Sequence, residues 1–327
     1  MKNKSESESE NVAENPTIPR RWSAQNLPDL TGKKFLITGG TSGLGLSAAR
    51  ELIKANAQVT FTARTDKKGE IAIGQISARS NPRISYILMD LTDLNSVRTA
   101  AQKAKEKFNG GIDCLILNAG VMATPFTKTR DGFELQMGTN HLGHFAFAGL
   151  LKDHINERLI SISSQAHRMG SFGNNSTATI KKICLGTGKY SPWGAYGASK
   201  LANLLFISQV ERLRIKNNWR FIPLAAHPGY SDTNLQSVAP QMKENKWEER
   251  TIGLFNSIVA QSADKGALPM LCAATFPGLI GASYLGPDGF MEMRGYPKLT
   301  RAKALAYDQT LAENLWQVSE ELTGVKW

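Results

Sequence analysis

The sequence predicts an α/β protein in which a doubly wound parallel sheet is covered by helices on both faces. Three observations lead to this fold class. Short apolar runs alternate along the chain with longer amphipathic stretches. The runs are nearly continuously apolar, which is typical of strands buried on both faces. Strands that alternate with helices form right-handed crossovers, and these place successive strands parallel in one sheet.

The expected elements follow one another regularly after residue 33. Strands are expected at residues 34–38, 58–63, 84–89, 112–117, 159–163, 220–226 and 282–285. Helices are expected where apolar residues recur at helical spacing, at residues 45–57, 66–79, 93–108, 132–155, 192–215 and 302–322.

The N-terminal region differs in composition from the rest of the chain. Residues 1–15 are rich in Ser and Glu and contain almost no apolar side chains. Such a segment cannot bury enough apolar surface to offset its ordering entropy. We therefore expect residues 1–30 to form a disordered or loosely docked tail, with Trp22 and Leu27 as candidate docking residues. No repeat or second shift in composition follows, so residues 31–327 are expected to form a single domain.

The overall composition is that of a globular protein, with 41% hydrophobic and 20% charged residues. No apolar run approaches the roughly 18 residues that a membrane span needs, so no span is expected. The three cysteines lie far apart and form no CxxC pair, which argues against a disulfide framework and against a thiolate zinc site. A reducing compartment fits this cysteine usage, and we predict a cytoplasmic location.

The charge is strongly basic, with 39 Lys and Arg against 28 Asp and Glu and a net charge of +11. A basic balance suits nucleic acid, an anionic membrane or a phosphorylated ligand. The basic residues are spread along the chain, however, and no block of about five or six like charges occurs. We expect a solvated basic surface and no nucleic-acid partner.

A glycine-rich turn follows the first expected strand and reads TGGTSGLG over residues 38–45. The turn leaves a strand and opens a helix, which is the context that a dinucleotide-binding motif requires. Glycine permits a positive φ and lets backbone N–H groups approach a pyrophosphate, and the helix N-terminus adds a partial positive charge. The sequence therefore predicts a dinucleotide site at this turn.

Arg64 ends the second strand, where the residue type distinguishes NAD from NADP. An acidic residue here binds the ribose 2′-OH of NAD, whereas an Arg accommodates the 2′-phosphate of NADP. Asp66 is the one acidic residue nearby and comes two positions later. Arg64, with a guanidinium that can bind phosphate through two hydrogen bonds, favours NADP(H). The alternative is that Arg64 simply ends the strand at the surface.

Tyr196 and Lys200 are one helical turn apart and share a helix face. A phenol with a pKa near 10 is a poor acid or base at pH 7, but a neighbouring ammonium stabilises the phenolate. At about 4 Å and an effective dielectric constant near 20, the attraction is about 4 kcal/mol. We therefore expect the pKa of Tyr196 to fall by about two to three pH units, which suits a general acid or base.

Further polar residues are expected at the same edge of the sheet, where open α/β sheets bind ligands. Ser164 follows the strand at 159–163, and its hydroxyl can polarise a carbonyl oxygen. Asn118 and Pro228 follow two other strands. Asn140 lies on a neighbouring helix, where a structural amide is an equally good reading of the residue alone.

Taken in order, the motifs TGGTSGLG, NAG, TNHLGHF, ISSQAH, YGASK and HPG resemble those of the short-chain dehydrogenase/reductase family. The resemblance extends from about residue 31 to the C-terminus. TNHLGHF, SSxAH and SKLAN are similar to the retinol-dehydrogenase-like group and its bacterial relatives. The resemblance implies a Rossmann domain of about seven strands and a catalytic tetrad formed by Asn140, Ser164, Tyr196 and Lys200.

The family also implies a role for each of these residues. Its Tyr transfers the proton, its Lys holds the nicotinamide ribose and lowers the pKa of the Tyr, its Ser orients the substrate oxygen, and its Asn anchors a water of a proton relay. The residues that the resemblance places against NADP(H) are Gly39, Thr41, Ser42, Gly43, Leu44, Gly45, Arg64, Asp90, Leu91, Asn118, Gly120, Tyr196, Lys200, Pro228 and Thr233.

Two departures from the family pattern stand out. Ser164 and Tyr196 are separated by more residues than is usual, and the polar stretch 170–190 between them is expected to be an enlarged loop beside the active site. There is no apolar N-terminal anchor of the kind seen in membrane-bound retinol dehydrogenases, so retinoid chemistry is not expected. Residues 230–262 are expected to form a substrate-covering lid, or else a plain pair of surface helices.

The histidines are expected to be structural. His141 and His144 have a spacing that suits a metal, but no further Cys, His or carboxylate lies nearby in the sequence, so no metal site is predicted. His167 and His227 are expected to make local hydrogen bonds.

The function that these observations favour is an NADP-dependent oxidoreductase that transfers hydride between nicotinamide and a carbonyl or alcohol carbon, with Tyr196 as general acid and base. Three alternatives are a C=C reductase similar to light-dependent protochlorophyllide reductase, a catalytically silent NADP-sensing regulator, and a nucleic-acid binder. The intact tetrad argues against a sensor. The substrate is expected to be a small molecule, and an oligomer is compatible with the sequence.

Overall fold

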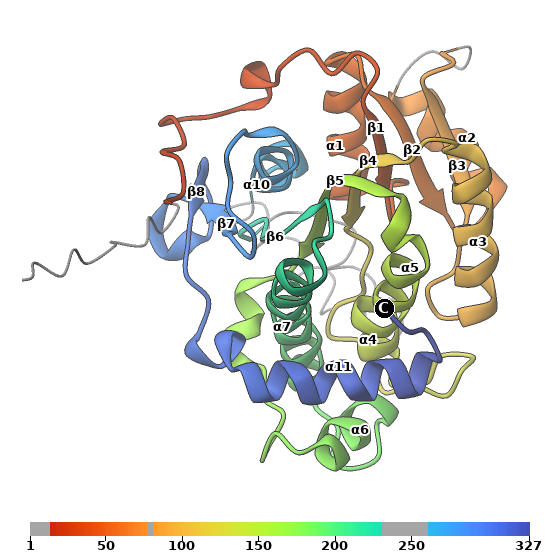
Figure 1. The fold of residues 1–327 in the computed structure, drawn as a ribbon, viewed down its shortest axis with the longest axis vertical. Helices are drawn as coiled ribbons and strands as arrows, with labels where there is room; N and C mark the ends of the chain where they lie inside the picture. Colours follow the sequence, from red (N-terminus) through yellow and green to blue (C-terminus); the bar gives the residue numbers. More distant parts are fainter. Residues whose placement is uncertain (1–13, 77–80, 231–260) are drawn as a thin grey trace, which may run out of the picture.

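The computed structural model describes residues 14–76, 81–230 and 261–327, and there the chain forms one sheet between two layers of helices (Figure 1). The strands are β1 (Lys34–Ile37), β2 (Gln58–Ala63), β3 (Ile84–Leu88), β4 (Ile112–Leu117), β5 (Ile155–Ile162), β6 (Ile222–Ala226), β7 (Tyr284–Pro287) and β8 (Pro297–Leu299). Their order is β3-β2-β1-β4-β5-β6-β7-β8. The order reverses between β1 and β4, and an open α/β sheet binds its ligand at such a reversal.

The prediction of a doubly wound parallel sheet is confirmed, with eight strands in place of about seven. Strands β1 to β7 pair in parallel, whereas β8 runs antiparallel to β7 and pairs Pro297 with Pro287. The extra strand has three residues and begins with a proline, so it carries no alternating pattern that the sequence could reveal. Proline is tolerated there because β8 is the edge of the sheet.

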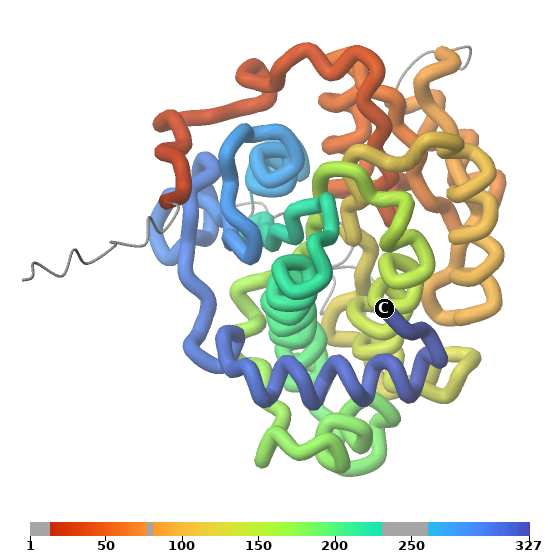
Figure 2. Tube along the Cα trace, in the orientation of Figure 1, coloured from red at the N-terminus to blue at the C-terminus, as the bar shows by residue number. Residues whose placement is uncertain are grey.

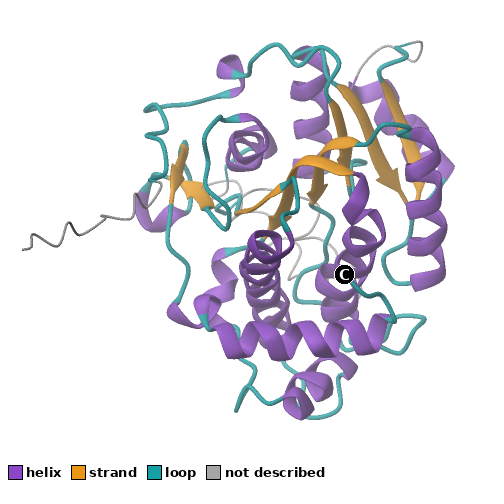
Figure 3. Cartoon of the chain, in the orientation of Figure 1, coloured by secondary structure: helices purple, strands orange, loops and turns teal. Residues whose placement is uncertain are grey.

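The helices form two layers, one on each face of the sheet (Figure 3). One layer, around α1 (Gly43–Lys54) and α10 (Ala263–Thr275), packs on the sheet through residues such as Leu52 and Leu271. The other layer, around α5 (Gly143–Leu151) and α7 (Pro192–Asn217), packs through residues such as Phe145 and Leu205. The helix α11 (Gln309–Thr323) lies across the outside of this second layer (Figure 2). The helices are α1 (Gly43–Lys54), α2 (Asp66–Ile76), α3 (Leu94–Lys107), α4 (Leu135–Met137), α5 (Gly143–Leu151), α6 (Thr177–Leu185), α7 (Pro192–Asn217), α10 (Ala263–Thr275) and α11 (Gln309–Thr323). No helix within the described ranges combines the length and the apolar character that a bilayer crossing requires.

The helix expected at residues 132–155 is interrupted. A π-helical turn at Gly138–Leu142 separates α4 from α5. Single π-helical turns are rare and frequently lie at functional sites. The turn contains Asn140, so the irregular backbone coincides with one of the predicted catalytic residues.

The stretch 170–190, which was expected to be a polar loop, contains the helix α6. Ser176 caps the helix start by accepting a hydrogen bond from the Thr179 N–H, and Gly186 ends it with a φ of +64°. Ile180 and Cys184 bury the inner face of α6 against the core that includes Phe145. The insertion is therefore packed onto the domain.

The described part of the N-terminal region lies along α10 and the β7 side of the sheet (Figure 2). The Asn15 side chain accepts hydrogen bonds from Ile280 N (2.9 Å) and Ser283 Oγ (2.8 Å). Trp22 is 3% exposed and belongs to the apolar core of α1 and α10, and Leu27 packs against that core. Residues 1–13 lie outside the described ranges.

Candidate active site

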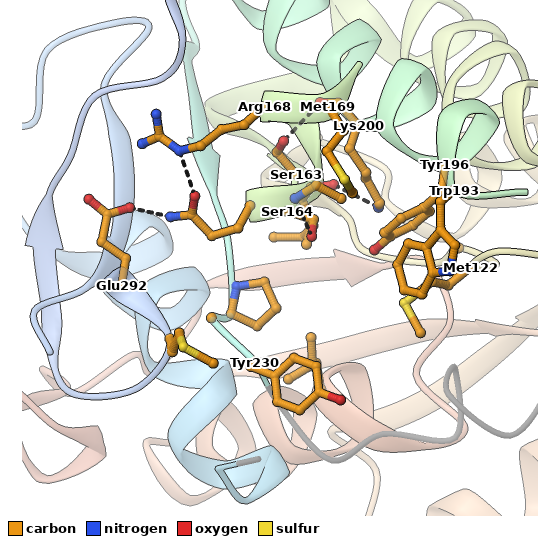
Figure 4. Close-up of a pocket in the computed structure, with 18 of the residues that line it drawn as sticks. Met122, Ser163, Ser164, Arg168, Met169, Trp193, Tyr196, Lys200, Tyr230 and Glu292 are labelled. Carbon is orange, nitrogen blue, oxygen red and sulfur yellow. Dashed lines mark hydrogen bonds between the residues drawn. The ribbon is translucent and has the colours of Figure 1, made fainter. Parts of the chain in front are cut away.

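A cavity of about 620 Å³ lies at the carboxyl end of the sheet. Segments that follow β4, β5, β6 and β7, together with the start of α7, enclose it (Figure 4). The lining residues include Leu44, Asn118, Gly120, Met122, Ser164, Gln165, Arg168, Met169, Trp193, Tyr196, Lys200, Pro228, Tyr230, Met291, Glu292 and Met293. The fold thus brings predicted site residues from distant parts of the sequence to one cavity.

The glycine turn lies where β1 passes into α1, and its backbone leaves no room for side chains. A Cβ at Gly45 would lie 2.3 Å from the Gly39 carbonyl oxygen, and Gly39 has a φ of +70°. Ser42 stands at the N-cap of α1, but its side chain accepts no hydrogen bond from the first turn. Uncapped N–H groups at a helix N-terminus form a cradle for a phosphate. The turn therefore fits a dinucleotide, with Thr41 and Gly43 in the cradle and Leu44 on the cavity wall.

Arg64 directly follows β2, as predicted, and is exposed. Its guanidinium makes no hydrogen bond or ion pair with any residue that the structure describes. Asp66 instead begins α2 and accepts a hydrogen bond from the Tyr86 hydroxyl (3.0 Å). The acidic side chain nearest to Arg64 in sequence is therefore engaged on the neighbouring strand.

Asp90 and Leu91 lie at the carboxyl end of β3. The Asp90 carboxylate accepts hydrogen bonds from the Thr92 N–H (2.9 Å) and hydroxyl (2.8 Å), and Leu91 is buried. Neither residue lines the cavity. The Asp90 side chain is thus engaged within its own turn, and its predicted contact with a cofactor stays a prediction.

Asn118 braces the glycine turn. Its side-chain amide donates to the carbonyl oxygens of Thr38 (2.9 Å) and Gly39 (3.1 Å). Gly120, two residues later, needs to be small because a Cβ there would lie 3.0 Å from Asn140 Oδ1 and 3.6 Å from Lys200 Nζ.

Asn140 is fully buried, and its side chain is engaged with the protein itself. Its Oδ1 accepts from Val121 N (2.8 Å), and its Nδ2 donates to Val121 O (2.9 Å) and Ser199 Oγ (2.9 Å). Asn140 does not line the cavity. The amide therefore connects α7 to the segment after β4, as the structural reading of this residue implied.

Ser164 and Tyr196 face each other across the cavity wall, with the phenol oxygen pointing towards Ser164 (Figure 4). Ser164 begins the short helix at Gln165–Met169, and its hydroxyl accepts a hydrogen bond from Ala166 N (3.2 Å). Ser163, its neighbour, donates to the Lys200 carbonyl oxygen (2.8 Å) and fixes α7 against β5. Both serines line the cavity, but the Ser163 hydroxyl is engaged with α7, whereas the Ser164 hydroxyl lies on the side of Tyr196 (Figure 4).

The pKa of Tyr196 differs from the expectation. Burial raises the pKa of Tyr196 to about 12, against a smaller lowering effect of the hydrogen bond with Ser164. The Lys200 ammonium nitrogen lies 5.7 Å from the centre of the Tyr196 ring and donates to the Ile162 carbonyl oxygen (3.1 Å). Burial also lowers the pKa of Lys200 to about 8. The predicted lowering of the Tyr196 pKa is therefore wrong for the structure described, because burial outweighs the hydrogen bond with Ser164.

Pro228 lines the cavity, and its carbonyl oxygen accepts a hydrogen bond from the Gln261 side chain (2.5 Å). The backbones of residues 230 and 261 also meet here, since Gln261 N donates a hydrogen bond to Tyr230 O (2.9 Å). Thr233 and nearly all of the expected lid at 230–262 lie outside the described residues.

A polar cluster on the cavity wall was not predicted. The Glu292 carboxylate is bonded by Gln165, Thr300 and His227, the last at 3.1 Å. Burial alone would raise the pKa of Glu292, but hydrogen bonds from His227 and Thr300 lower it to about 2. Glu292 follows β7 in a turn without a recognisable motif, so the sequence carried no signal for it beyond His227 in the HPG motif.

His141, His144, His167 and His227 make hydrogen bonds within the protein, as expected. His141 bonds Ser319 (2.8 Å), His167 bonds the Ser164 carbonyl oxygen (2.7 Å), and His144 bonds Thr38 (2.8 Å). Over the described ranges, no three His, Cys, Asp or Glu side chains are grouped in a way that suits a metal ion.

Comparison with known proteins gives a consistent picture. Residues 33–183 match the model of the short chain dehydrogenase family. The chain is 31% identical over 310 residues to the human polyprenol dehydrogenase, covering 91% of this chain and 87% of that protein. It is 33% identical over 305 residues to the mouse retinol dehydrogenase 12, covering 91% and 88%.

Solved structures show the same fold. A crystal structure of an uncharacterised protein from Mycobacterium paratuberculosis is 37% identical, with a TM-score of 0.76, and the match covers 93% of this chain and 98% of that one. A short chain dehydrogenase from Burkholderia cenocepacia, solved in complex with NADP, is 22% identical with a TM-score of 0.58, and the match covers 78% and 96%.

Proposed function

Because the chain belongs to the short-chain dehydrogenase/reductase family, in its retinol-dehydrogenase-like group, we propose that it is an NADP-dependent oxidoreductase that interconverts a carbonyl and an alcohol. Tyr196 acts as the general acid and base. The observation that carries the proposal is the convergence of Ser164, Tyr196 and Lys200 on one cavity beside the glycine turn. The neighbouring cradle fits the pyrophosphate of a dinucleotide.

A bound nicotinamide dinucleotide supplies or accepts the hydride, which the side chains of this protein cannot do. The cradle of residues 39–45 would hold its pyrophosphate, and Lys200 its nicotinamide ribose. Arg64 would hold the 2′-phosphate that distinguishes NADP, which is supported by its exposure and by the engagement of Asp66 with Tyr86. The NADP bound to the Burkholderia cenocepacia relative supports the same choice.

The protonation state of Tyr196 favours donation of a proton to the substrate. Since the pKa of Tyr196 is raised to about 12, its phenol keeps its proton at neutral pH. A protonated phenol facing Ser164 can donate to the oxygen of a carbonyl while the Ser164 hydroxyl holds the same oxygen. The site is therefore prepared for carbonyl reduction, and alcohol oxidation must first remove the phenol proton.

The cavity wall supports a largely apolar substrate. Met122, Met169, Trp193, Met291 and Met293 line it, and methionine side chains adapt to apolar ligands of different shapes. The polyprenol and retinol dehydrogenases among the relatives are named for apolar alcohols. We place the reaction in the cytoplasm, with support from the three cysteines, each of which is free and buried.

The test uses NADPH that carries deuterium at C4, with a panel of apolar aldehydes, ketones, quinones and ketosteroids. We expect the label on the carbinol carbon of the product. We also expect Tyr196→Phe to slow single-turnover transfer by about 10²–10⁴-fold, because general acid catalysis contributes that much. NADPH affinity should be nearly unchanged in this variant. Label on a saturated carbon that had belonged to a C=C bond of the substrate, with near-normal transfer by Tyr196→Phe, would overturn the proposal in favour of C=C reduction. NADPH binding with no turnover of any compound would favour a sensor.

A further inference from the structure

His144 is buried at the start of α5, 3% exposed, and both of its ring nitrogens have partners. Its Nε2 lies 2.8 Å from the Thr38 hydroxyl oxygen. Its Nδ1 lies 3.1 Å from the Asn140 carbonyl oxygen. The imidazole therefore joins the end of β1 to the π-helical turn.

The hydrogen bonds of Thr38 determine which ring nitrogen carries the proton. The Thr38 hydroxyl oxygen accepts from Asn118 N (2.9 Å) and Ala119 N (3.0 Å). A hydroxyl has two acceptor sites and one hydrogen, so both acceptor sites are used and the hydrogen must point to His144. Nε2 of His144 is then the acceptor. Nδ1 carries the hydrogen and donates it to the Asn140 carbonyl oxygen, which has no hydrogen to give.

The two ends of this chain of hydrogen bonds lie in different parts of the site. Thr38 precedes Gly39, whose positive φ begins the cofactor cradle. Asn140 holds Ser199 and thereby α7, which carries Tyr196 and Lys200. His144 itself does not line the cavity. Any influence that it has on the reaction must therefore act through the position of these segments.

We propose that His144, as a neutral imidazole protonated at Nδ1, is a positioning residue that holds the cofactor cradle and the helix of Tyr196 at a fixed relative position. Its significance for catalysis and its effect on NADPH binding rest on the proposed function, whereas its protonation does not. Burial lowers the pKa of His144 to about 4, with a further lowering by Lys200, so the ring is neutral at pH 7 as the hydrogen bonds require.

The first test observes the imidazole directly in the full-length protein, with no substrate and no variant in the measured state. The ¹⁵N chemical shifts of ring-labelled protein at pH 7, assigned through His144→Gln, report which nitrogen is protonated. We expect a protonated Nδ1 and an unprotonated Nε2. A proton on Nε2, or on both nitrogens, would overturn the proposal.

The second test breaks the link at its other end. Thr38→Val removes the hydroxyl but keeps the shape of the side chain, and Thr38→Ser is the matched control that keeps the hydroxyl. A displaced cradle weakens its hydrogen bonds to the charged pyrophosphate, so we expect Thr38→Val and His144→Leu each to weaken NADPH binding by about tenfold or more. Thr38→Ser and His144→Gln should recover most of the affinity, since each restores a group able to form the link.

A double-mutant cycle makes this test specific. Thr38→Val removes the link to His144 and also the acceptor for Asn118 N and Ala119 N. The double variant should therefore bind NADPH about as weakly as Thr38→Val alone, because His144→Leu has no further link to break in that background. Fully additive losses would overturn the proposal, as would normal binding by two folded single variants. These results concern binding alone and are separate from the deuterium-transfer experiment. If a variant fails to fold, the nitrogen shifts of the unmodified protein still decide.

Discussion

Burial, more than charge pairing, controls the protonation of the two residues at the centre of the site. It raises the pKa of Tyr196 to about 12 and lowers the pKa of Lys200 to about 8. The position of Lys200 therefore opposes folding, because a buried ammonium gives up its hydration. Its cost to the free energy of unfolding can be measured.

We expect Lys200→Met to raise the free energy of unfolding at pH 7 by about 2 kcal/mol. The Lys200 pKa falls from 10.5 to about 8 on folding, a cost of roughly 3 kcal/mol at about 1.4 kcal/mol per pH unit. The lost hydrogen bond to the Ile162 carbonyl oxygen offsets roughly 1 kcal/mol of the gain.

The pH dependence provides the control for this variant. Below pH 8 both folded and unfolded chains hold the proton on Lys200, so the full cost is present. Between about pH 8 and 10.5 the unfolded chain binds more protons, so the unmodified protein gains stability as the pH rises. Urea unfolding at pH 6.5 and 9.5 should show the difference between the two proteins shrinking. A constant difference would contradict the assigned pKa shift.

Cofactor preference should depend on one exposed residue. Arg64→Ala is expected to remove a preference for NADPH over NADH of about tenfold or more, equal to about 1.4 kcal/mol of binding free energy. Lys67→Ala removes the same charge from a neighbouring exposed position and is the matched control. Dissociation constants measured by quenching of protein fluorescence give the comparison. Equal affinity for both cofactors in the unmodified protein would show that Arg64 is a surface residue only.

Among the helices and strands, the sequence predicted best those elements whose pattern of apolar residues matches their burial in the fold. The strands from β1 to β7 and the glycine turn were predicted because each buried strand is a continuous apolar run. The helices α6 and α10 and the strand β8 were missed. A nine-residue helix in a polar stretch and a three-residue edge strand have too few apolar positions to show a period. α10 contains Pro269 and is buried on almost every side, so no apolar stripe marks it as a helix.

In the candidate site, too, the sequence predicted only the residues that belong to a recognisable motif. The sequence located Ser164, Tyr196 and Lys200 through their motifs, and the fold brings them together. It could not reveal that burial would raise the Tyr196 pKa, because burial depends on the whole fold. Nor could it reveal Glu292, which reaches the cavity only because the chain turns back after β7.

The turn after β7 carries strain in its backbone. Met291 has a φ of 49° and ψ of 24°, and Glu292 has a φ of 56°, a left-handed conformation that side chains disfavour. The contacts of Glu292 with His227, Gln165 and Thr300 hold the turn in place. Strained residues persist where the surroundings fix them, frequently at binding sites.

Met291→Gly is expected to raise the free energy of unfolding by up to about 1 kcal/mol, because glycine adopts a left-handed conformation without strain. The Met291 side chain is 70% exposed, so little packing is lost. Phe290→Gly is the matched control, since Phe290 is 84% exposed but not left-handed, and it should lower the stability. Thermal melting of both variants gives the comparison. Equal destabilisation would contradict the strain at Met291.

At the scale of the whole molecule, Trp22 and Trp327 are far apart in the sequence and pack into opposite apolar layers of the domain. The C-terminal Trp327 packs among Trp316, Phe206 and Phe145 on the α7 face. Trp22 packs into the opposite layer with α1 and α10. We propose that the described residues form one cooperative domain to which the region before residue 31 contributes directly.

Trp22→Ala is therefore expected to lower the free energy of unfolding by about 3–5 kcal/mol, the usual effect of removing a large buried aromatic side chain. Trp193→Ala removes the same side chain from a position that is 51% exposed and should cost much less. Deleting residues 1–13 should change the stability by no more than about 0.5 kcal/mol, because their composition offers almost no apolar surface to bury. Urea unfolding followed by circular dichroism compares the three proteins. If Trp22→Ala were as stable as the unmodified chain, or if the deletion were the most destabilising change, Trp22 would not anchor the N-terminal region.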